Sequence, residues 1–148
     1  MKQIAQHNQP ATDKDSLHVL IVEDDQTDLL LVQRYVSKAF TGSSFDVVGT
    51  LAAALHQLDT VSYDFVILDI MLPDSSGLDT LRSIMEKAHH IPVLVYSGQQ
   101  NPEMALEAMK IGAQDFLVKG RGDEFTFRRI MQYSIERKRT EMRIYRNE

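Results

Sequence analysis

The chain contains no cysteine, so disulfide bonds and thiolate metal ligands are both excluded. It also lacks any apolar run close to the roughly 18 residues of a membrane span, and its polar start does not resemble a signal peptide. An excess of positive charge is absent too. The formal net charge is −5, which argues against non-specific binding to nucleic acid. We therefore expect a cytoplasmic protein that neither enters a membrane nor binds nucleic acid directly.

What is present suits one folded domain. The chain has 148 residues, of which 43% are hydrophobic and 25% charged, so it can bury a core of its own. Residues 1–16 are polar and aperiodic and are expected to form a flexible tail. We expect residues 17–136 to form the domain, and residues 137–148 to extend its last helix.

Apolar and amphipathic segments alternate along the chain. Five apolar segments predict buried strands, namely HVLIVEDD, FDVVG, YDFVILD, IPVLVYSG and AQDFLVKG. A segment with helical spacing follows each of them, and these helices are expected at 27–40, 51–58, 78–88, 102–111 and from Phe125 onward. Thr27 is expected to cap the first helix.

This alternation predicts an α/β fold with a parallel sheet. Because the strands are continuously apolar, we expect helices on both faces of the sheet, in three layers. Right-handed crossovers bring the carboxyl ends of all strands to one edge, where ligands bind in such sheets.

Several strands end in side chains that can do chemistry. These are Glu23, Asp24 and Asp25 after the first strand, Asp69 after the third, Ser97 on the fourth and Lys119 on the fifth. Clustered carboxylates repel one another unless a cation compensates them, and a few carboxylates with water and phosphate suit Mg²⁺. An aspartate beside such an ion can attack phosphorus and form an aspartyl phosphate. Mg²⁺, Lys119 and the Ser97 hydroxyl would then neutralise charge on the transferring group.

The segments LIVEDD, LDIMLPDSSGL, VLVYSG and DFLVKG resemble, in order and spacing, the receiver domain of bacterial two-component response regulators. The resemblance covers about residues 17–136. It implies a flavodoxin-like, doubly wound sheet of five parallel strands with five helices.

The resemblance also implies a role for each residue. Asp69 would accept the phosphoryl group, with Mg²⁺ bound directly by Asp24, by Asp69 and by the Met71 carbonyl, and by Glu23 mainly through water. Asp25 remains an alternative to Asp24. The other implied roles belong to Ser97 and Lys119, which would contact phosphoryl oxygens, and to Phe116, which would change rotamer on activation.

Two positions depart from the family pattern. Gly120 stands where most receivers carry a proline after the lysine, so the loop to the last helix is expected to be looser or differently shaped. Phe116 replaces the more frequent tyrosine and lacks its hydroxyl, so packing alone would drive its movement.

The resemblance implies a signalling module rather than a turnover enzyme, although such a module takes part in its own phosphoryl transfer and autodephosphorylation. Its phosphodonor would be a histidine kinase or a histidine phosphotransfer protein. Self-association would use the face of the fourth helix, fifth strand and fifth helix. Because no room for an output domain follows residue 136, we expect a stand-alone receiver or a piece of a longer protein.

The alternative function is a phosphohydrolase of the haloacid dehalogenase type, which also uses an aspartate nucleophile and Mg²⁺. That class expects its nucleophile on the first strand, with a second acid two residues later. Here Asp69 follows the third strand, and the residue two positions later is Met71.

Overall fold

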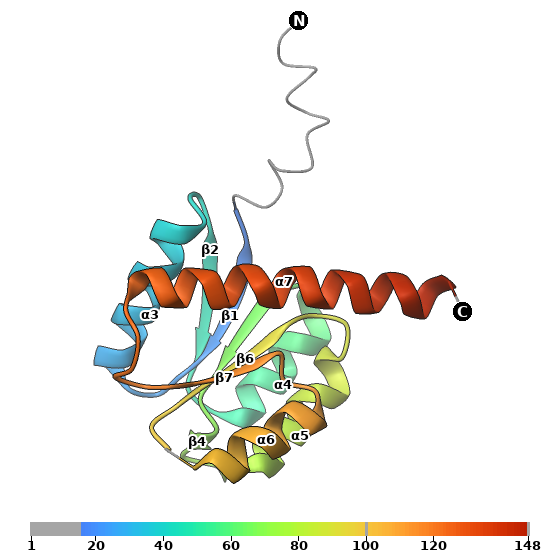
Figure 1. Cartoon of the computed structure of the whole chain (residues 1–148). Helices are drawn as coiled ribbons and strands as arrows, with labels where there is room; N and C mark the ends of the chain where they lie inside the picture. Colours follow the sequence, from blue (N-terminus) through green and yellow to red (C-terminus); the bar gives the residue numbers. More distant parts are fainter. Residues whose placement is uncertain (1–15, 100, 148) are drawn as a thin grey trace, which may run out of the picture.

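The computed structural model describes residues 16–99 and 101–147. Apart from Ser16, the predicted N-terminal tail lies outside the described residues. The central sheet has five parallel strands, β1 (His18–Val22), β2 (Ser44–Val48), β3 (Phe65–Leu68), β6 (Val93–Ser97) and β7 (Asp115–Val118). Their spatial order is β2-β1-β3-β6-β7 (Figure 1). The predicted flavodoxin-like fold is confirmed.

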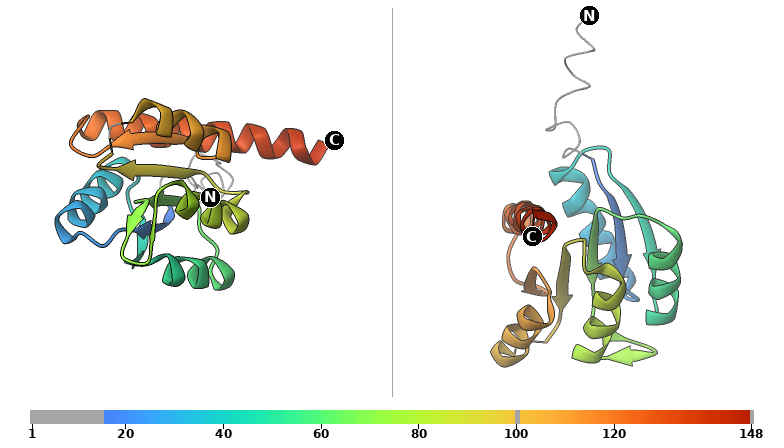
Figure 2. Two further views of the ribbon diagram at one scale, coloured as in Figure 1. Left: turned by 90° about the horizontal axis from the view of Figure 1, so that it is seen from below. Right: turned by 90° about the vertical axis from the view of Figure 1, so that its right-hand side faces the viewer.

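In the part of the chain that the structure describes, five helices cover the two faces of this sheet and make three layers (Figure 2). One face carries α3 (Gln26–Ala39) and α7 (Glu124–Asn147). The other carries α4 (Leu51–Thr60), α5 (Leu78–Ala88) and α6 (Pro102–Ile111). No helix within the described residues is long and apolar enough to cross a membrane.

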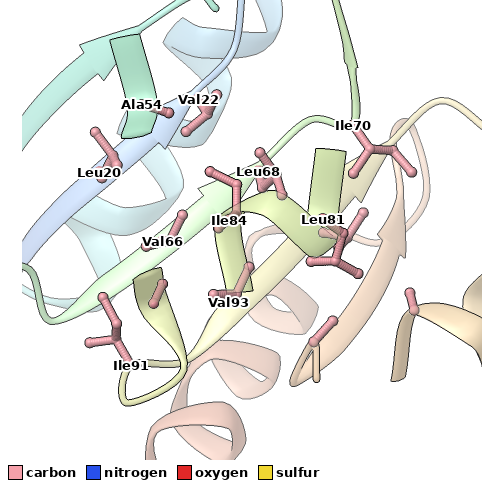
Figure 3. Packing of buried hydrophobic residues seen from close by; sticks show 14 of the residues in the cluster. Leu20, Val22, Ala54, Val66, Leu68, Ile70, Leu81, Ile84, Ile91 and Val93 are labelled. Atoms are coloured by element: carbon pink, nitrogen blue, oxygen red, sulfur yellow. The ribbon is translucent and has the colours of Figure 1, made fainter. Parts of the chain in front are cut away.

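The central strands β1, β3 and β6 are almost entirely apolar because their alternate side chains enter two different cores. The edge strands β2 and β7 are only partly buried. On β1, Leu20 and Val22 belong to the cluster under α4, α5 and α6, whereas Val19 and Ile21 belong to the cluster under α3 and α7. Figure 3 shows the first cluster, in which side chains of α5 such as Ile84 face the strands. This double burial explains why the sequence shows no alternating pattern.

Local structure differs from the sequence expectation in two places. A short antiparallel hairpin, β4 (Met71–Leu72) with β5 (Ser75–Ser76), lies between β3 and α5, where the sequence predicted no strand. The cap of α3 is Asp25 rather than Thr27, since Asp25 has extended backbone angles and its Oδ1 accepts the Asp28 N–H at 3.0 Å. Thr27 already lies inside the helix.

Candidate functional site

Asp69 lies directly beyond β3, at the carboxyl edge of the sheet. Its backbone N–H donates to the Val22 carbonyl at 2.9 Å, which continues the pairing of β3 with β1 by one residue. The side chain is buried, with 5% of the residue's surface exposed. Its Oδ1 accepts the Met71 backbone N–H at 3.0 Å, and its Oδ2 lies 2.9 Å from the Lys119 ammonium. A carboxylate at the mouth of the core is therefore held by a cation and a backbone donor.

Two further carboxylates from the end of β1 lie beside Asp69. Oxygens of Glu23, Asp24 and Asp69 all lie within 4.8 Å of one another, with Glu23 buried and Asp24 exposed. Asp25 is not in this group, because it caps α3 instead. Of the two adjacent aspartates, the structure thus brings Asp24 to the cluster. Three carboxylates form an all-oxygen set of donors, which fits a hard divalent cation such as Mg²⁺.

Lys119 connects this cluster to the far end of the sheet. Its backbone N–H donates to the Ser97 carbonyl at 2.7 Å, and its side chain reaches back to the acids. The Nζ atom lies 3.0 Å from Glu23, 2.8 Å from Asp28 and 2.9 Å from Asp69. Burial acts to lower the pKa of Lys119, but the hydrogen bonds to the three carboxylates outweigh it and hold that pKa above its usual range.

One lysine does not balance this many acids. The pKa of Glu23 is raised to about 7, mainly by burial and also by the charge of Asp69, whereas the hydrogen bond from Lys119 acts to lower it. The carboxylates of the cluster therefore outnumber its one ammonium group, and a further cation would stabilise their charged forms.

Asp28 was not among the residues expected in the site. It lies in the first turn of α3, where an acidic residue is readily explained by the helix dipole. Its position in the sequence could have predicted its place in the site, because the helix that follows β1 begins at the edge of the sheet where Asp69 lies.

The hydrogen bond of Ser97 and the packing of Phe116 involve residues other than the acids of the cluster. Ser97, at the end of β6, is fully buried, and its Oγ accepts the Gln99 N–H at 3.1 Å. Among the described residues, no hydrogen bond joins Ser97 to Asp69. Phe116, on β7, packs against the cluster under α6 and borders a hollow of about 330 Å³ that Pro102 and Ala105 also line.

The backbone explains why glycine follows Lys119. Gly120 has a φ of +83°, in the left-handed region that a proline ring cannot adopt. The loop from β7 to α7 therefore has a shape that the usual proline would not permit.

Comparison with known proteins decides the family. Residues 19–138 match the model of the response regulator receiver domain. The chain belongs to this family. Among curated proteins, the chain is 36% identical over 105 residues to the probable transcriptional regulatory protein SilR of Salmonella typhimurium, covering 70% of this chain and 44% of SilR. It is 32% identical over 99 residues to the regulatory protein LuxO of Vibrio cholerae, covering 67% of this chain and 21% of LuxO. The chain thus spans less than half the length of these relatives.

Solved structures agree with this assignment. The signal receiver domain of a putative LuxO repressor from Vibrio parahaemolyticus has a TM-score of 0.74 and 25% identity, covering 87% of this chain and 97% of that one. A CheY-like receiver domain from Methanospirillum hungatei has a TM-score of 0.73 at 18% identity, covering 84% of this chain and 97% of that chain, which supports the fold alone.

The receiver is a phosphoacceptor module of two-component signalling, and this assignment confirms the predicted class of function. A receiver implies phosphodonor partners such as histidine kinases. Neither the family match nor the fold supports a phosphohydrolase of the haloacid dehalogenase type.

Proposed function

We propose that Asp69 is the phosphoacceptor of this receiver and that a histidine kinase or histidine phosphotransfer protein supplies the phosphoryl group in a Mg²⁺-dependent reaction. The observation that carries the proposal is the placement of Asp69, buried at the edge of the sheet with Lys119 2.9 Å from its Oδ2. Residues 17–136 form the proposed functional unit, with residues 137–148 as its helical extension. The cytoplasm is the proposed place of action.

In the proposed reaction, a carboxylate oxygen of Asp69 attacks the phosphorus and forms the acyl phosphate bond. The bond from phosphorus to the donor nitrogen or oxygen breaks, and the leaving group keeps that electron pair. Lys119 and the Ser97 hydroxyl neutralise charge on the equatorial phosphoryl oxygens. Autodephosphorylation is the corresponding attack of water on phosphorus, which returns Asp69 to its free carboxylate.

Mg²⁺ is the proposed cofactor, since the donors at hand are all oxygens and carry excess negative charge. Asp24, Asp69 and the Met71 carbonyl would hold the ion directly, and Glu23 would do so mainly through water. When bound, the ion supplies charge neutralisation between the acids and an incoming phosphate.

The proposed output is a change in the face made by α6, β7 and α7. A phosphoryl group on Asp69 would attract the Ser97 hydroxyl and draw the β6–α6 loop inward, so that Phe116 can move into the space beside Pro102 and Ala105. Exposed apolar residues on this face, including Leu106, Met109 and Phe125, support its use in self-association or partner binding.

The test is the intact mass of the protein after incubation with acetyl phosphate and Mg²⁺. Wild type should gain one phosphoryl group, and Asp69→Asn should gain none. Full labelling of Asp69→Asn would overturn the assignment of Asp69.

A further inference from the structure

Lys119 has a carboxylate partner that the proposed phosphoryl transfer does not use. Its Nζ lies 2.8 Å from Asp28, which is closer than the 2.9 Å to Asp69 and the 3.0 Å to Glu23. An ammonium group has three N–H donors, so three carboxylates can take all of them. Of these three acids, only Asp28 lies outside the group whose oxygens can share one cation.

The position of Asp28 is well defined. It lies in the first turn of α3, and its backbone N–H is held by the side chain of Asp25 at 3.0 Å. Only 29% of its side chain is exposed, and its bond to Lys119 joins residues 91 positions apart in sequence. The ammonium also lies 6.0 Å from the centre of the Tyr96 ring, a distance at which the ring face attracts a cation. Lys119 is therefore held from α3 and β6 as well as from the acids beside β1 and β3.

A divalent cation changes the balance around Lys119. It would be held by Asp69 directly and by Glu23 mainly through water, although both carboxylates now accept from Lys119, and it would repel the ammonium. Asp28 takes no part in that competition. On the basis of the proposed roles of Asp69 and Lys119, we infer that Asp28 is a positioning residue, which keeps the Lys119 ammonium beside Asp69 when a divalent cation binds.

This role also fits the proposed transfer itself. When Asp69 becomes phosphorylated, the Lys119 N–H that points at Asp69 can turn to a phosphoryl oxygen. The N–H that points at Asp28 needs no rearrangement. Lys119 thus changes one partner and keeps another, which limits the entropy lost in placing the ammonium.

The test compares Asp28→Asn with Asp25→Asn. Both remove one negative charge at the start of α3. Asparagine at position 25 keeps a good helix cap, and that change leaves the Lys119 contacts in place. Three measurements serve both variants: Mg²⁺ titration, the ¹⁵N–¹H signal of the Lys119 ammonium with and without Mg²⁺, and the single-turnover rate with acetyl phosphate at saturating Mg²⁺.

For Asp28→Asn, we expect Mg²⁺ affinity and the single-turnover rate each to fall by about 10-fold. The Lys119 ammonium signal should broaden or disappear when Mg²⁺ is added, whereas in wild type it persists. Asp25→Asn should remain close to wild type in all three, and Asp28→Glu should retain the ammonium signal.

Equal effects of Asp28→Asn and Asp25→Asn would overturn the inference, because they would indicate a general effect of charge. Loss of the fold in Asp28→Asn would leave the decision to Asp28→Glu, where loss of the ammonium signal on adding Mg²⁺ would also overturn it. The Mg²⁺ titration and ammonium signal need no phosphorylation. A failure of wild type to become labelled would therefore contradict the proposed function and leave this test intact.

Discussion

Asp24 and Asp25 are neighbours in sequence with different contacts. Asp24 is exposed and contributes an oxygen to the group formed with Glu23 and Asp69. Asp25 accepts the Asp28 N–H and so satisfies one of the N–H groups in the first turn of α3 that have no partner within the helix. The two side chains differ because Asp25 caps the start of α3, whereas Asp24 is left to join the other acids.

This difference predicts the response to Mg²⁺. Asp24→Ala should weaken Mg²⁺ binding by more than about 10-fold, because it removes a charged oxygen donor from the cluster. Asp25→Asn should bind Mg²⁺ nearly as wild type does. Isothermal titration of both variants is the measurement, and unchanged affinity in Asp24→Ala would rule out its proposed role.

Ser97 is the residue whose hydrogen bond must change if the switch operates as proposed. Its hydroxyl now accepts from Gln99, and a charged phosphoryl oxygen would offer a stronger, charge-assisted partner. Ser97→Ala should still become phosphorylated, since Asp69 and the acidic cluster remain. It should lose the structural change around Phe116.

The measurement is an amide NMR comparison of free and beryllofluoride-bound protein, in wild type and in Ser97→Ala. Large shifts at Phe116 and in residues 102–111 should occur in wild type alone. Shifts of equal size in both proteins would show that Ser97 does not couple the site to this face.

At the scale of elements, the segment after Asp69 is attached to the start of α4. Both carboxylate oxygens of Asp74 accept backbone N–H groups, from Leu51 at 2.8 Å and from Ala52 at 3.0 Å. Thr50 caps the next donor, Ala53, at 3.1 Å. The first turn of α4 therefore depends on a side chain from the hairpin β4–β5, which holds that hairpin beside the acidic cluster.

This attachment predicts a dependence of stability on pH. The N–H groups of Leu51 and Ala52 lower the pKa of Asp74 in the folded protein. Its contribution is then complete above the pKa of an unfolded aspartate, about 3.9, and is lost as the pH falls through the lower folded value.

Asp74→Ala should accordingly lower the free energy of unfolding at pH 7, and the gap from wild type should close as the solution becomes acidic below about pH 4. Urea unfolding at several pH values measures this gap. The control is Glu86→Gln, an exposed change of equal charge within α5. A gap for Asp74→Ala that does not vary with pH would contradict the account.

Two phenylalanines on α7 allow a buried side chain to be compared with an exposed one on the same helix. Phe127 is 1% exposed and contacts the rings of Tyr35 on α3 and Tyr96 on β6, whereas Phe125 is 53% exposed. Phe127→Ala should lower the free energy of unfolding by about 3–5 kcal/mol. Phe125→Ala should change it by less than about 0.5 kcal/mol. Similar losses in chemical denaturation would mean that α7 is not anchored through Phe127.

At the scale of the whole molecule, most of the architecture is readable from the sequence. The central strands β1, β3 and β6 are almost entirely apolar because both faces of the sheet are covered, and this pattern predicts the layers and the edge where Asp69 and Lys119 meet. The acids of the cluster follow from that edge, since parallel strands all end there.

Contacts between distant segments are what the sequence does not reveal. Asp28 approaches Lys119 only because α3 begins at the edge of the sheet where β7 ends. Asp74 reaches α4 only through the hairpin turn. In sequence, each is an ordinary acidic residue in a helix start or a loop. Their partners are 91 and 23 positions away, beyond the reach of local patterns.

The central claim is that Asp69, at the carboxyl edge of the sheet, is the residue that becomes phosphorylated. Locating the acyl phosphate tests this claim most directly. Borohydride reduces an aspartyl phosphate to homoserine, which marks the modified position in a peptide mass spectrum. After treatment with acetyl phosphate and Mg²⁺, homoserine should appear at position 69 and at no other aspartate. Homoserine at position 24, 25 or 28 instead, with none at position 69, would contradict the account.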